Sequence, residues 1–398
     1  MSRPRLALGA LALLLLLLGA DTVYRAGPSE RTDLPVYLAG ARRVLAGEDP
    51  LLVESGRGWP YVYPPTLAVL LIPLTALPLR VAAGLWFLLS AAAAGLGWWA
   101  WLAARRPEGS PAPPAARDLW PWLLVALPCT SALLRGQTGP LLLGLLLGAA
   151  ACLLRKRDAL AGALVALAAA IKLTPALVIV GLAAARRWRA LAGAAAGLAL
   201  WLALVPLPFL GARGTAAALE HFTRHMVLRP VRNPGEPDLT SRNVHVGNNQ
   251  SLSSLAIRHL EGRARTLTLS LLLLGAVGVA LGLSLGGAGE VAPSEGAWAL
   301  LVAAPLLVAP IAWHHHHVLL LPALAFLCAR PERSARAALV GFALLSLLHF
   351  AVPPLRPLGL LGLGTLWVFL CVAALSLRPG VDEGEPASAA AGPADGPL

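Results

Sequence analysis

Long apolar runs dominate the pattern of hydrophobic and polar positions along this chain. Leu- and Ala-rich stretches of about 15 to 25 residues alternate with shorter polar segments, and a run of that length crosses about 30 Å of hydrocarbon as an α-helix. The pattern predicts an all-α, polytopic integral membrane protein with about twelve transmembrane helices. This membrane domain covers residues 1–378, and the Pro-, Ala- and Gly-rich tail 379–398 is predicted to be disordered.

Arginines between the apolar runs predict the orientation of the helices. Arg3 and Arg5 precede the first run, 6–20, and the positive-inside rule then places the N-terminus in the cytoplasm. The run also fits a cleavable signal peptide, although the many runs that follow favour an uncleaved first helix. In this topology the polar segments 21–63 and 211–265 lie on the outer face of the plasma membrane.

The middle of the chain contains a predicted pair of helices and one interrupted run on which the number of crossings depends. Pro64-Pro65 is predicted to open a pair of helices over 65–79 and 82–103. The run 158–185 is interrupted by Lys172, Thr174 and Pro175, which fits either one kinked span or a short hairpin. The kinked span is preferred because it makes the number of crossings agree with the arginines that follow.

The two outer segments hold most of the polar residues that are available for chemistry. In the first, Leu34, Tyr37, Leu38 and Val44 recur at helical spacing, which predicts an amphipathic helix at the membrane interface. Asp33 directly precedes this helix and is predicted as its N-cap or as a functional carboxylate, two roles that do not exclude each other. The second segment has about 55 residues, more than a connection between two helices requires, and long loops of this kind are usually functional or disordered.

Composition excludes several classes of protein. Of the 398 residues 57% are apolar and only 13% are charged, which rules out an ordinary water-soluble enzyme. The net charge of +12 comes almost wholly from Arg, and no basic stretch is interleaved with aromatic residues, so we expect no nucleic-acid partner. The chain has no glycine-rich phosphate loop, which disfavours nucleotide-driven transport. Its four cysteines lie in apolar runs and are expected to be small buried side chains.

Lys172 and a run of histidines are the other candidates for chemistry. Lys172 lies deep in an apolar run, where an ammonium group is costly enough to indicate a function, although a snorkelling lysine is the alternative. His314 to His317 invite a metal site, but only His314 and His317 share a helix face. Hydrogen bonding to a phosphate or sugar is therefore favoured over metal binding. His221 and His225 are four residues apart and could likewise bind a metal or hydrogen-bond a phosphate or sugar. The alternative is that they lie on a solvated interfacial helix.

Several short motifs follow one another in a fixed order over about residues 20 to 325. They are Asp33-Leu34-Pro35-Val36-Tyr37, Gly47-Glu48-Asp49-Pro50, Tyr61-Val62-Tyr63-Pro64-Pro65, Gly136-Gln137, Ile171-Lys172-Leu173-Thr174-Pro175, Arg186-Arg187-Trp188-Arg189, Asn249-Gln250-Ser251-Leu252 and Trp313-His314-His315-His316. This order resembles that of glycosyltransferase family 87, which contains polyprenol-phosphate-mannose-dependent mannosyltransferases of the GT-C membrane superfamily.

The resemblance implies a GT-C-like fold and a membrane glycosyltransferase with Asp33 as general base. Asp33 would deprotonate the acceptor hydroxyl for inverting attack on a polyprenyl-phosphate hexose, with mannose as the expected sugar and a lipid-linked or cell-envelope glycan as acceptor on the outer face. No cofactor is expected, and the first outer segment lacks the DxD pair that would support a metal. The side chains predicted to bind substrate are Tyr37, Tyr63, Gln137, Lys172, Asn249, Gln250, Arg258, His315 and His316.

A secondary transporter or lipid flippase is the alternative from another class. Such transporters are commonly built from internal repeats with a binding site near the bilayer midplane. The chain shows no internal repeat, and its polar residues gather in the outer segments instead. The glycosyltransferase is therefore the preferred prediction.

Overall fold

The computed structural model describes residues 3–26, 31–53, 59–106, 116–228, 247–286 and 294–377. Within these ranges the chain is helical and forms no extended strand, so the predicted all-α class is confirmed. The tail 379–398 lies outside the described residues.

The helices follow one another with short connections. The α-helices are α1 (Arg3–Ala26), α2 (Leu34–Leu45), α3 (Pro65–Leu70), α4 (Leu79–Ala104), α5 (Trp120–Leu124), α6 (Ala126–Leu134), α7 (Gly139–Leu154), α8 (Asp158–Ile171), α9 (Ala176–Ala184), α10 (Trp188–Leu198), α11 (Leu207–Phe222), α14 (Leu252–His259), α15 (Gly262–Gly286), α16 (Glu295–Val308), α17 (Leu321–Cys328), α18 (Arg333–Ala351) and α19 (Leu360–Ser376). Short 3₁₀ helices are Pro50–Leu52, Ile72–Ala76, Ala116–Leu119, His314–Leu320 and Pro353–Leu358, and π-helical turns are Ala199–Leu204 and Thr223–Leu228.

Several described helices are long and apolar enough to cross a membrane. These are Leu79–Ala104, Gly262–Val279 and Arg333–Ala351, and the pair Trp188–Leu204 and Leu207–Leu228, bent by 98°, adds a fourth if the pair counts as one span. Shorter apolar helices are Gly139–Leu154, Asp158–Ile171, Glu295–Val308 and Leu360–Ser376. These helices indicate a membrane-embedded protein, whereas the number of twelve crossings stays a prediction.

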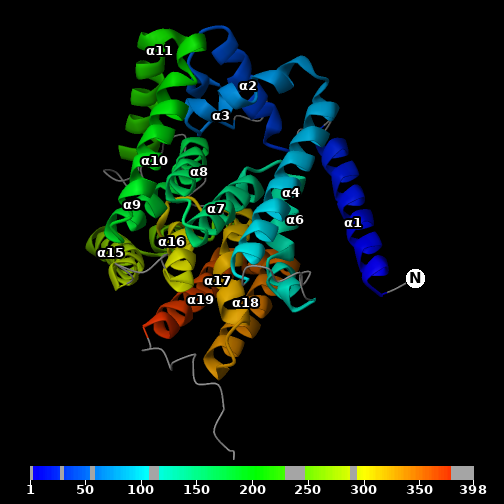
Figure 1. Ribbon diagram of the computed structural model, residues 1–398, viewed down its shortest axis with the longest axis vertical. Helices are drawn as coiled ribbons and strands as arrows, with labels where there is room; N and C mark the ends of the chain where they lie inside the picture. Colours follow the sequence, from blue (N-terminus) through cyan, green and yellow to red (C-terminus); the bar gives the residue numbers. More distant parts are fainter. Residues whose placement is uncertain are drawn as a thin grey trace, which may run out of the picture.

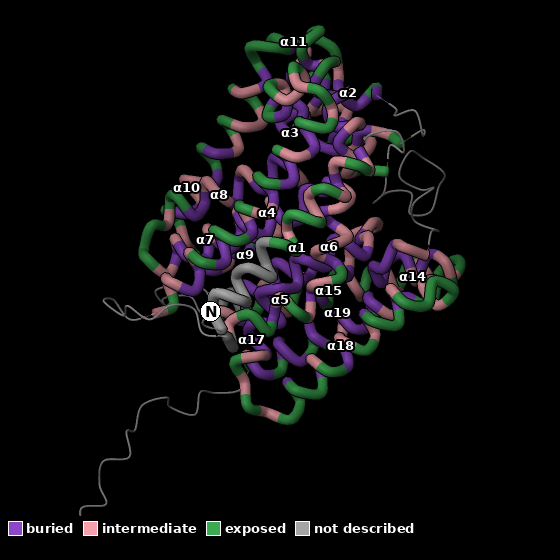
Figure 2. The backbone as a smooth tube through the Cα atoms, turned by 90° about the vertical axis from the view of Figure 1, so that its right-hand side faces the viewer, coloured by how far each residue is buried: buried purple, intermediate pink, exposed green. Residues whose placement is uncertain are grey.

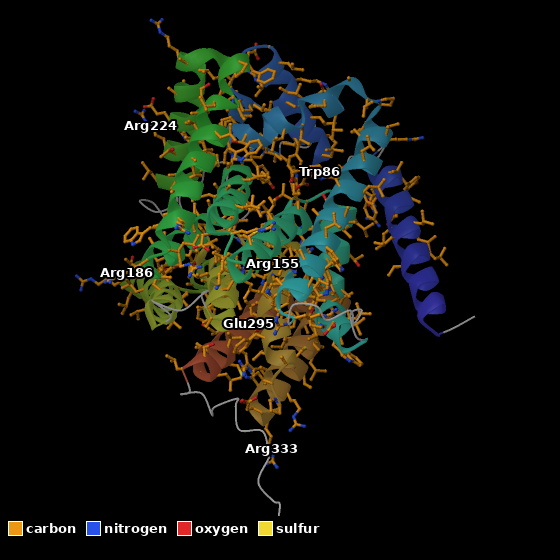
Figure 3. The ribbon with its side chains drawn as sticks, in the orientation of Figure 1. Trp86, Arg155, Arg186, Arg224, Glu295 and Arg333 are labelled. Carbon is orange, nitrogen blue, oxygen red and sulfur yellow. The ribbon has the colours of Figure 1, made fainter. Side chains whose placement is uncertain are left out.

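The helices are arranged along one long axis. At one end, the upper end in Figure 1, α2, α3 and α11 gather, and α18 and α19 lie at the opposite end. Buried residues extend along this axis from α2 and α3 to α19 (Figure 2). Charged side chains such as Arg224 and Arg333 extend outward near opposite ends (Figure 3). The first outer segment and α11 therefore cover one end of the helical body.

Glycines allow some of the helices to approach one another closely. Gly97 of α4 lies against Gly144 of α7, and a Cβ on either residue would overlap the backbone of the other helix. Gly162 of α8 lies against the Ala190 carbonyl of α10 in the same way. Small residues at contacts of this kind are typical of helices that pack in a membrane. They hold α7 and α8, which lead into the candidate site, inside the bundle.

Two segments differ from the sequence prediction. Residues 65–79 were predicted as one helix, but α3 ends at Leu70 and a 3₁₀ turn follows, because prolines interrupt the helical hydrogen bonds in this short stretch. The start of the predicted polar segment 211–265 is instead helical up to Leu228. Its apolar side chains Ala218 and Phe222 are buried. A positive φ of 66° at Gly211 allows the bend at which this segment begins.

The predicted interruption of run 158–185 is present. Helix α8 ends at Ile171, Lys172 is extended with φ −150° and ψ 132°, and α9 begins at Ala176 after Pro175. Proline cannot continue the hydrogen bonding of a helix and disfavours helical geometry at the residue before it. The break carries Lys172 out of the helix and toward the cavity described next.

Candidate active site

A cavity of about 290 Å³ lies where α2 and the residues before α3 meet the helical body. Side chains from the start of α2, the segment before α3, the α6–α7 turn, the α8–α9 break, α11 with the π-turn that follows it, and the segment after α16 surround it. The lining residues are Asp33, Val36, Tyr37, Trp59, Pro60, Val62, Tyr63, Gln137, Lys172, Leu173, Thr174, Phe222, Met226, Ala309, Pro310, Ile311, Trp313 and His316. The cavity therefore brings together residues that are widely separated in the sequence.

Asp33 occupies the N-cap position of α2 but does not cap the helix with its side chain. Its backbone N–H donates to the Arg135 carbonyl at 2.9 Å, which ties the start of α2 to the α6–α7 turn. The Gln137 side-chain amide donates to Oδ2 of Asp33. The expectation of an N-cap carboxylate is therefore wrong for the side chain, which is turned toward Gln137 and the cavity.

The α6–α7 turn fixes Gln137 beside Asp33. Gly136 has a positive φ of 64°, a conformation that favours glycine, and its carbonyl accepts a 2.8 Å hydrogen bond from the Trp86 indole N–H. Trp86 reaches this turn from α4, as its labelled position inside the body in Figure 3 illustrates. The backbone N–H of Gln137 donates to the Ala132 carbonyl. Gln137 thus orients the carboxylate from a rigid turn.

Two tyrosines form the wall next to Asp33. The hydroxyl groups of Tyr37 and Tyr63 lie 3.0 Å apart, and their rings meet edge to face at 5.1 Å. Burial raises the pKa of both phenols, and the neighbouring Asp33 carboxylate adds to the shift. Both hydroxyl groups therefore remain protonated at neutral pH. One proton forms the hydrogen bond between the two phenols, and the other can be donated to a ligand.

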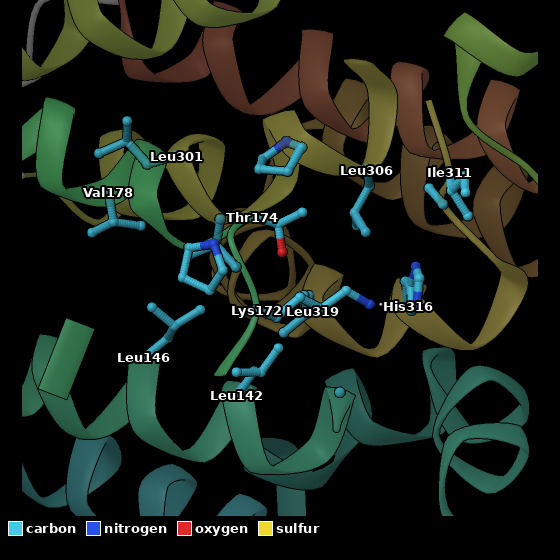
Figure 4. Close-up of a pocket in the computed structure, with 15 residues that line it drawn as sticks. Leu142, Leu146, Lys172, Thr174, Val178, Leu301, Leu306, Ile311, His316 and Leu319 are labelled. Atoms are coloured by element: carbon cyan, nitrogen blue, oxygen red, sulfur yellow. Dashed lines mark hydrogen bonds between the residues drawn. The ribbon is translucent and has the colours of Figure 1, made fainter. Parts of the chain in front are cut away.

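Lys172 places a cation in the same cavity. Its Nζ lies 2.8 Å from Nε2 of His316 and 5.7 Å from the centre of the Tyr63 ring. Figure 4 shows the lysine stem among apolar side chains, including Leu142 and Leu319, with its tip directed at His316. The Trp313 backbone N–H donates to Nδ1 of His316 at 3.1 Å, which fixes the ring with Nε2 toward Lys172. The backbone contact therefore orients the imidazole, and the apolar side chains hold the lysine stem.

A pair of tryptophans lines the cavity, and sequence reasoning did not assign them to the site. The rings of Trp59 and Trp313 stack with 6.4 Å between centroids and 15° between planes. Flat aromatic faces and neighbouring hydrogen-bonding groups suit a ligand with apolar and polar sides. The sequence signal was available, because Trp59 lies in the polar outer segment and Trp313 directly precedes the histidine run.

Asn249, Gln250 and Arg258 do not line the cavity but hold its wall. Asn249 is fully buried, donates to the Pro310 carbonyl at 2.8 Å and accepts from the Ala312 N–H at 2.9 Å. Gln250 bonds the Arg356 carbonyl and accepts from the Leu361 N–H, and Arg258 donates to the Asn249 carbonyl. We therefore expect these three predicted binding residues to act by positioning the segment 309–313.

Asn249→Ala should destabilise the protein by about 2 kcal/mol or more, because it leaves buried backbone groups without partners. The thermal midpoint in detergent measures this effect. Asn248→Ala is the matched control, since Asn248 is only half-buried and its side chain makes one 3.3 Å hydrogen bond with Arg356. Equal midpoints for the two variants would contradict the positioning role of Asn249.

The four histidines have different surroundings and do not form a shared site. His314 Nε2 lies 3.0 Å from Ser131 Oγ, His315 stacks on Trp313, His316 contacts Lys172, and His317 Nδ1 lies 3.3 Å from the Trp313 carbonyl. His315 is 3% exposed and does not line the cavity, unlike His316. Among the described residues no three His, Cys, Asp or Glu side chains come together as a metal site.

His221 and His225 lie outside the cavity. Nδ1 of His221 is 2.7 Å from Oδ2 of Asp49, and the two histidine rings are 4.8 Å apart. Asp49 also accepts from the Leu51 N–H at the start of a 3₁₀ helix. These contacts connect α11 to the segment that follows α2.

The cavity combines a carboxylate, an opposing cation and aromatic surfaces. A carboxylate can accept a proton from a hydroxyl group, and a cation with a neighbouring imidazole can hold an anionic leaving group. Such a cavity has the groups needed to transfer a group to a hydroxyl. The arrangement therefore defines a candidate transferase site within a helical membrane protein.

The comparison with family models identifies the class more closely. The model of glycosyltransferase family 87 matches residues 61–321, more than half of the chain, and the chain therefore belongs to this family. The matched region includes Tyr63, Gln137, Lys172 and His316, whereas Asp33 precedes it. The comparisons with curated proteins and with solved structures found no match.

Proposed function

We propose that this glycosyltransferase moves a hexose, with mannose as the favoured sugar, from a polyprenyl phosphate to a lipid-linked or cell-envelope glycan. The observation that carries the proposal is the shared cavity, in which Asp33, Lys172 and His316 meet in a family 87 chain. Asp33 acts as general base on the acceptor hydroxyl. The other predicted contacts, Tyr37, Tyr63 and Gln137, surround the same space.

The proposed chemistry is an inverting displacement. Asp33 removes the proton of the acceptor hydroxyl, the oxygen attacks the anomeric carbon, and the bond from that carbon to the lipid phosphate oxygen breaks. The phosphate leaves with the electron pair and its negative charge is balanced by Lys172, beside the imidazole of His316. A lipid phosphate is a good leaving group, so no nucleotide site is needed.

The proposed location is the plasma membrane, with the cavity open to the exoplasmic face. The support is the charge pattern, in which arginines precede the first apolar run and the polar segments 21–63 and 211–265 fall on one side. In this proposal the chain crosses the membrane about twelve times and α2 lies at the interface as an amphipathic helix. Membrane lipids then surround the domain 1–378.

A donor assay with the purified full-length protein in nanodiscs tests the proposed function. Radiolabelled polyprenyl-phosphate mannose, or glucose, is supplied together with a lipid extract that contains acceptors. We expect the label to appear in a new glycolipid whose anomeric configuration is opposite to that of the donor, and nucleotide sugars to give no product. Movement of labelled lipid across a vesicle membrane without a new glycan would instead support a transporter or flippase.

Trp59→Ala should raise the KM for the sugar donor about 3- to 10-fold, with kcat little changed, because it removes one face of the aromatic pair. Initial rates over a range of donor concentrations measure both constants. Trp99→Ala is the matched control, since Trp99 is an exposed tryptophan of α4 away from the cavity. A fall in kcat at unchanged KM would show that Trp59 does not bind the donor.

A further inference from the structure

A second cavity, of about 530 Å³, lies behind the wall of the first and shares none of its lining residues. It is bounded by the end of α1, by α6, by the 3₁₀ helix that begins at His314, and by the segment from Phe350 to Arg356. Residues two positions apart line different cavities: Arg135 lines the second and Gln137 the first, and His314 lines the second and His316 the first.

The second cavity has a strongly cationic lining. Arg25, Arg31, Arg135 and Arg356 contribute to it, and none of its described lining residues is a carboxylate. Asp21 pairs with Arg25 at 2.9 Å, and Arg356 donates to the His349 carbonyl and to Oδ1 of Asn248. Guanidinium groups gathered around one space repel one another, and their planar donors match the oxygen atoms of a phosphate. The charge of the cavity therefore favours a phosphate-bearing ligand.

His314 supplies a second observation that points to a ligand. The side chain is 5% exposed and its Nε2 lies 3.0 Å from Ser131 Oγ. Its Nδ1 is buried and finds no hydrogen-bond partner among the described residues. A buried polar atom without a partner is unfavourable, so the imidazole at the wall of this cavity has unused hydrogen-bonding capacity.

The rest of the lining is apolar and indicates the form in which the phosphate arrives. Leu127, Leu134 and Phe350 line the same cavity, and Leu127 is 38% exposed on the surface of α6. We propose that this cavity binds the phosphate group of a membrane lipid, with the guanidinium groups on the phosphate and these apolar side chains along the start of the lipid chain. A cavity of this size accommodates a head group as well as the first part of a chain.

This site lies close to the proposed catalytic base. The Arg135 carbonyl accepts the Asp33 N–H at 2.9 Å, so the residue whose guanidinium lines the second cavity also holds Asp33 at the first. The proposal goes beyond the proposed function, because a lipid phosphate can bind here whether or not sugar transfer follows. If transfer occurs, the cavity provides a second head-group position beside the reacting groups.

Calorimetric titration of the full-length protein in neutral detergent tests this site. The probes are citronellyl phosphate, a ten-carbon prenyl phosphate, and inorganic phosphate. The titrations use a Lys172→Met background, in which the first cavity lacks its ammonium group. Binding that remains in this background is then assigned to a site outside the first cavity. We expect citronellyl phosphate to bind in that background. The double substitution Arg31→Gln with Arg135→Gln should weaken the affinity for citronellyl phosphate at least tenfold. Inorganic phosphate should bind far more weakly than citronellyl phosphate.

Arg213→Gln is the matched control, because Arg213 is an exposed arginine of α11 outside the cavity. Unchanged binding in the double variant would overturn the site, and equal affinity for the two probes would overturn its assignment to a lipid. If the double variant does not fold, Arg31→Gln alone decides, since Arg31 is exposed and a several-fold loss is expected. None of these outcomes depends on sugar transfer, whose failure the donor assay reports separately.

Discussion

Asp33→Asn should lower kcat for sugar transfer by about a thousandfold, within the 10²- to 10⁴-fold range typical of a general base, and leave the protein folded. The amide of asparagine cannot take the proton of the acceptor hydroxyl. Its carbonyl oxygen can still accept from the Gln137 amide, so the start of α2 keeps its position. Initial rates at saturating polyprenyl-phosphate hexose measure the loss, and we expect KM to change less than about threefold.

Asp49→Asn is the matched control for this experiment. Asp49 is a carboxylate of the same outer segment, but it faces His221 and does not line the cavity. Both variants should have thermal midpoints near that of the wild type, while only Asp33→Asn loses activity. Sugar transfer by Asp33→Asn at more than a tenth of the wild-type rate would show that Asp33 is not the general base. This conclusion would hold even if the donor assay detects glycosyltransferase activity.

Helical class could be predicted from the sequence because the apolar runs are long and their boundaries carry strong local signals. Thr174-Pro175 predicted the break after α8 correctly, since proline acts on the backbone directly. The segment 65–79 was less predictable, because its composition fits a spanning helix and only the positions of its prolines limit α3 to six residues. The helix beyond Gly211 depends on packing of Phe222 and its neighbours, which local polarity does not reveal.

The candidate site could be predicted in part. Motif order placed Asp33, Gln137 and Lys172 among the functional residues, and they do line one cavity. The sequence could not show that the side chains of Asn249 and Gln250 bond backbone carbonyl groups instead of lining the cavity. A side-chain amide can bond a substrate or a carbonyl group equally well.

The second cavity was harder to foresee for a different reason. Its arginines come from segments far apart in the sequence, and an arginine between apolar runs is first explained by membrane topology. Arg25, Arg135 and Arg356 come together only through the packing of α1, α6 and the turn after α18. The sequence therefore identified individual candidate residues, but only the fold shows which of them line the first cavity and which line the second.

Lys172→Met should reduce kcat/KM for the polyprenyl-phosphate donor about 10- to 100-fold. A hydrogen bond to a charged group contributes about 1.5 to 3 kcal/mol, and the negative charge on the phosphate grows as the bond to the sugar breaks. Methionine keeps an unbranched stem among Leu142 and Leu319 but has no ammonium group. The protein should therefore stay folded while it loses stabilisation of the leaving phosphate.

Lys156→Met provides a close control, because Lys156 is the one other lysine of the chain and is exposed in the turn before α8. Kinetics with donors whose phosphate leaves more easily give a readout that a structural defect would not change. If Lys172 balances the charge of the leaving group, the deficit of Lys172→Met shrinks as the intrinsic leaving ability of the phosphate improves. A deficit that is the same for every donor would show that Lys172 acts by holding His316 or the cavity wall instead.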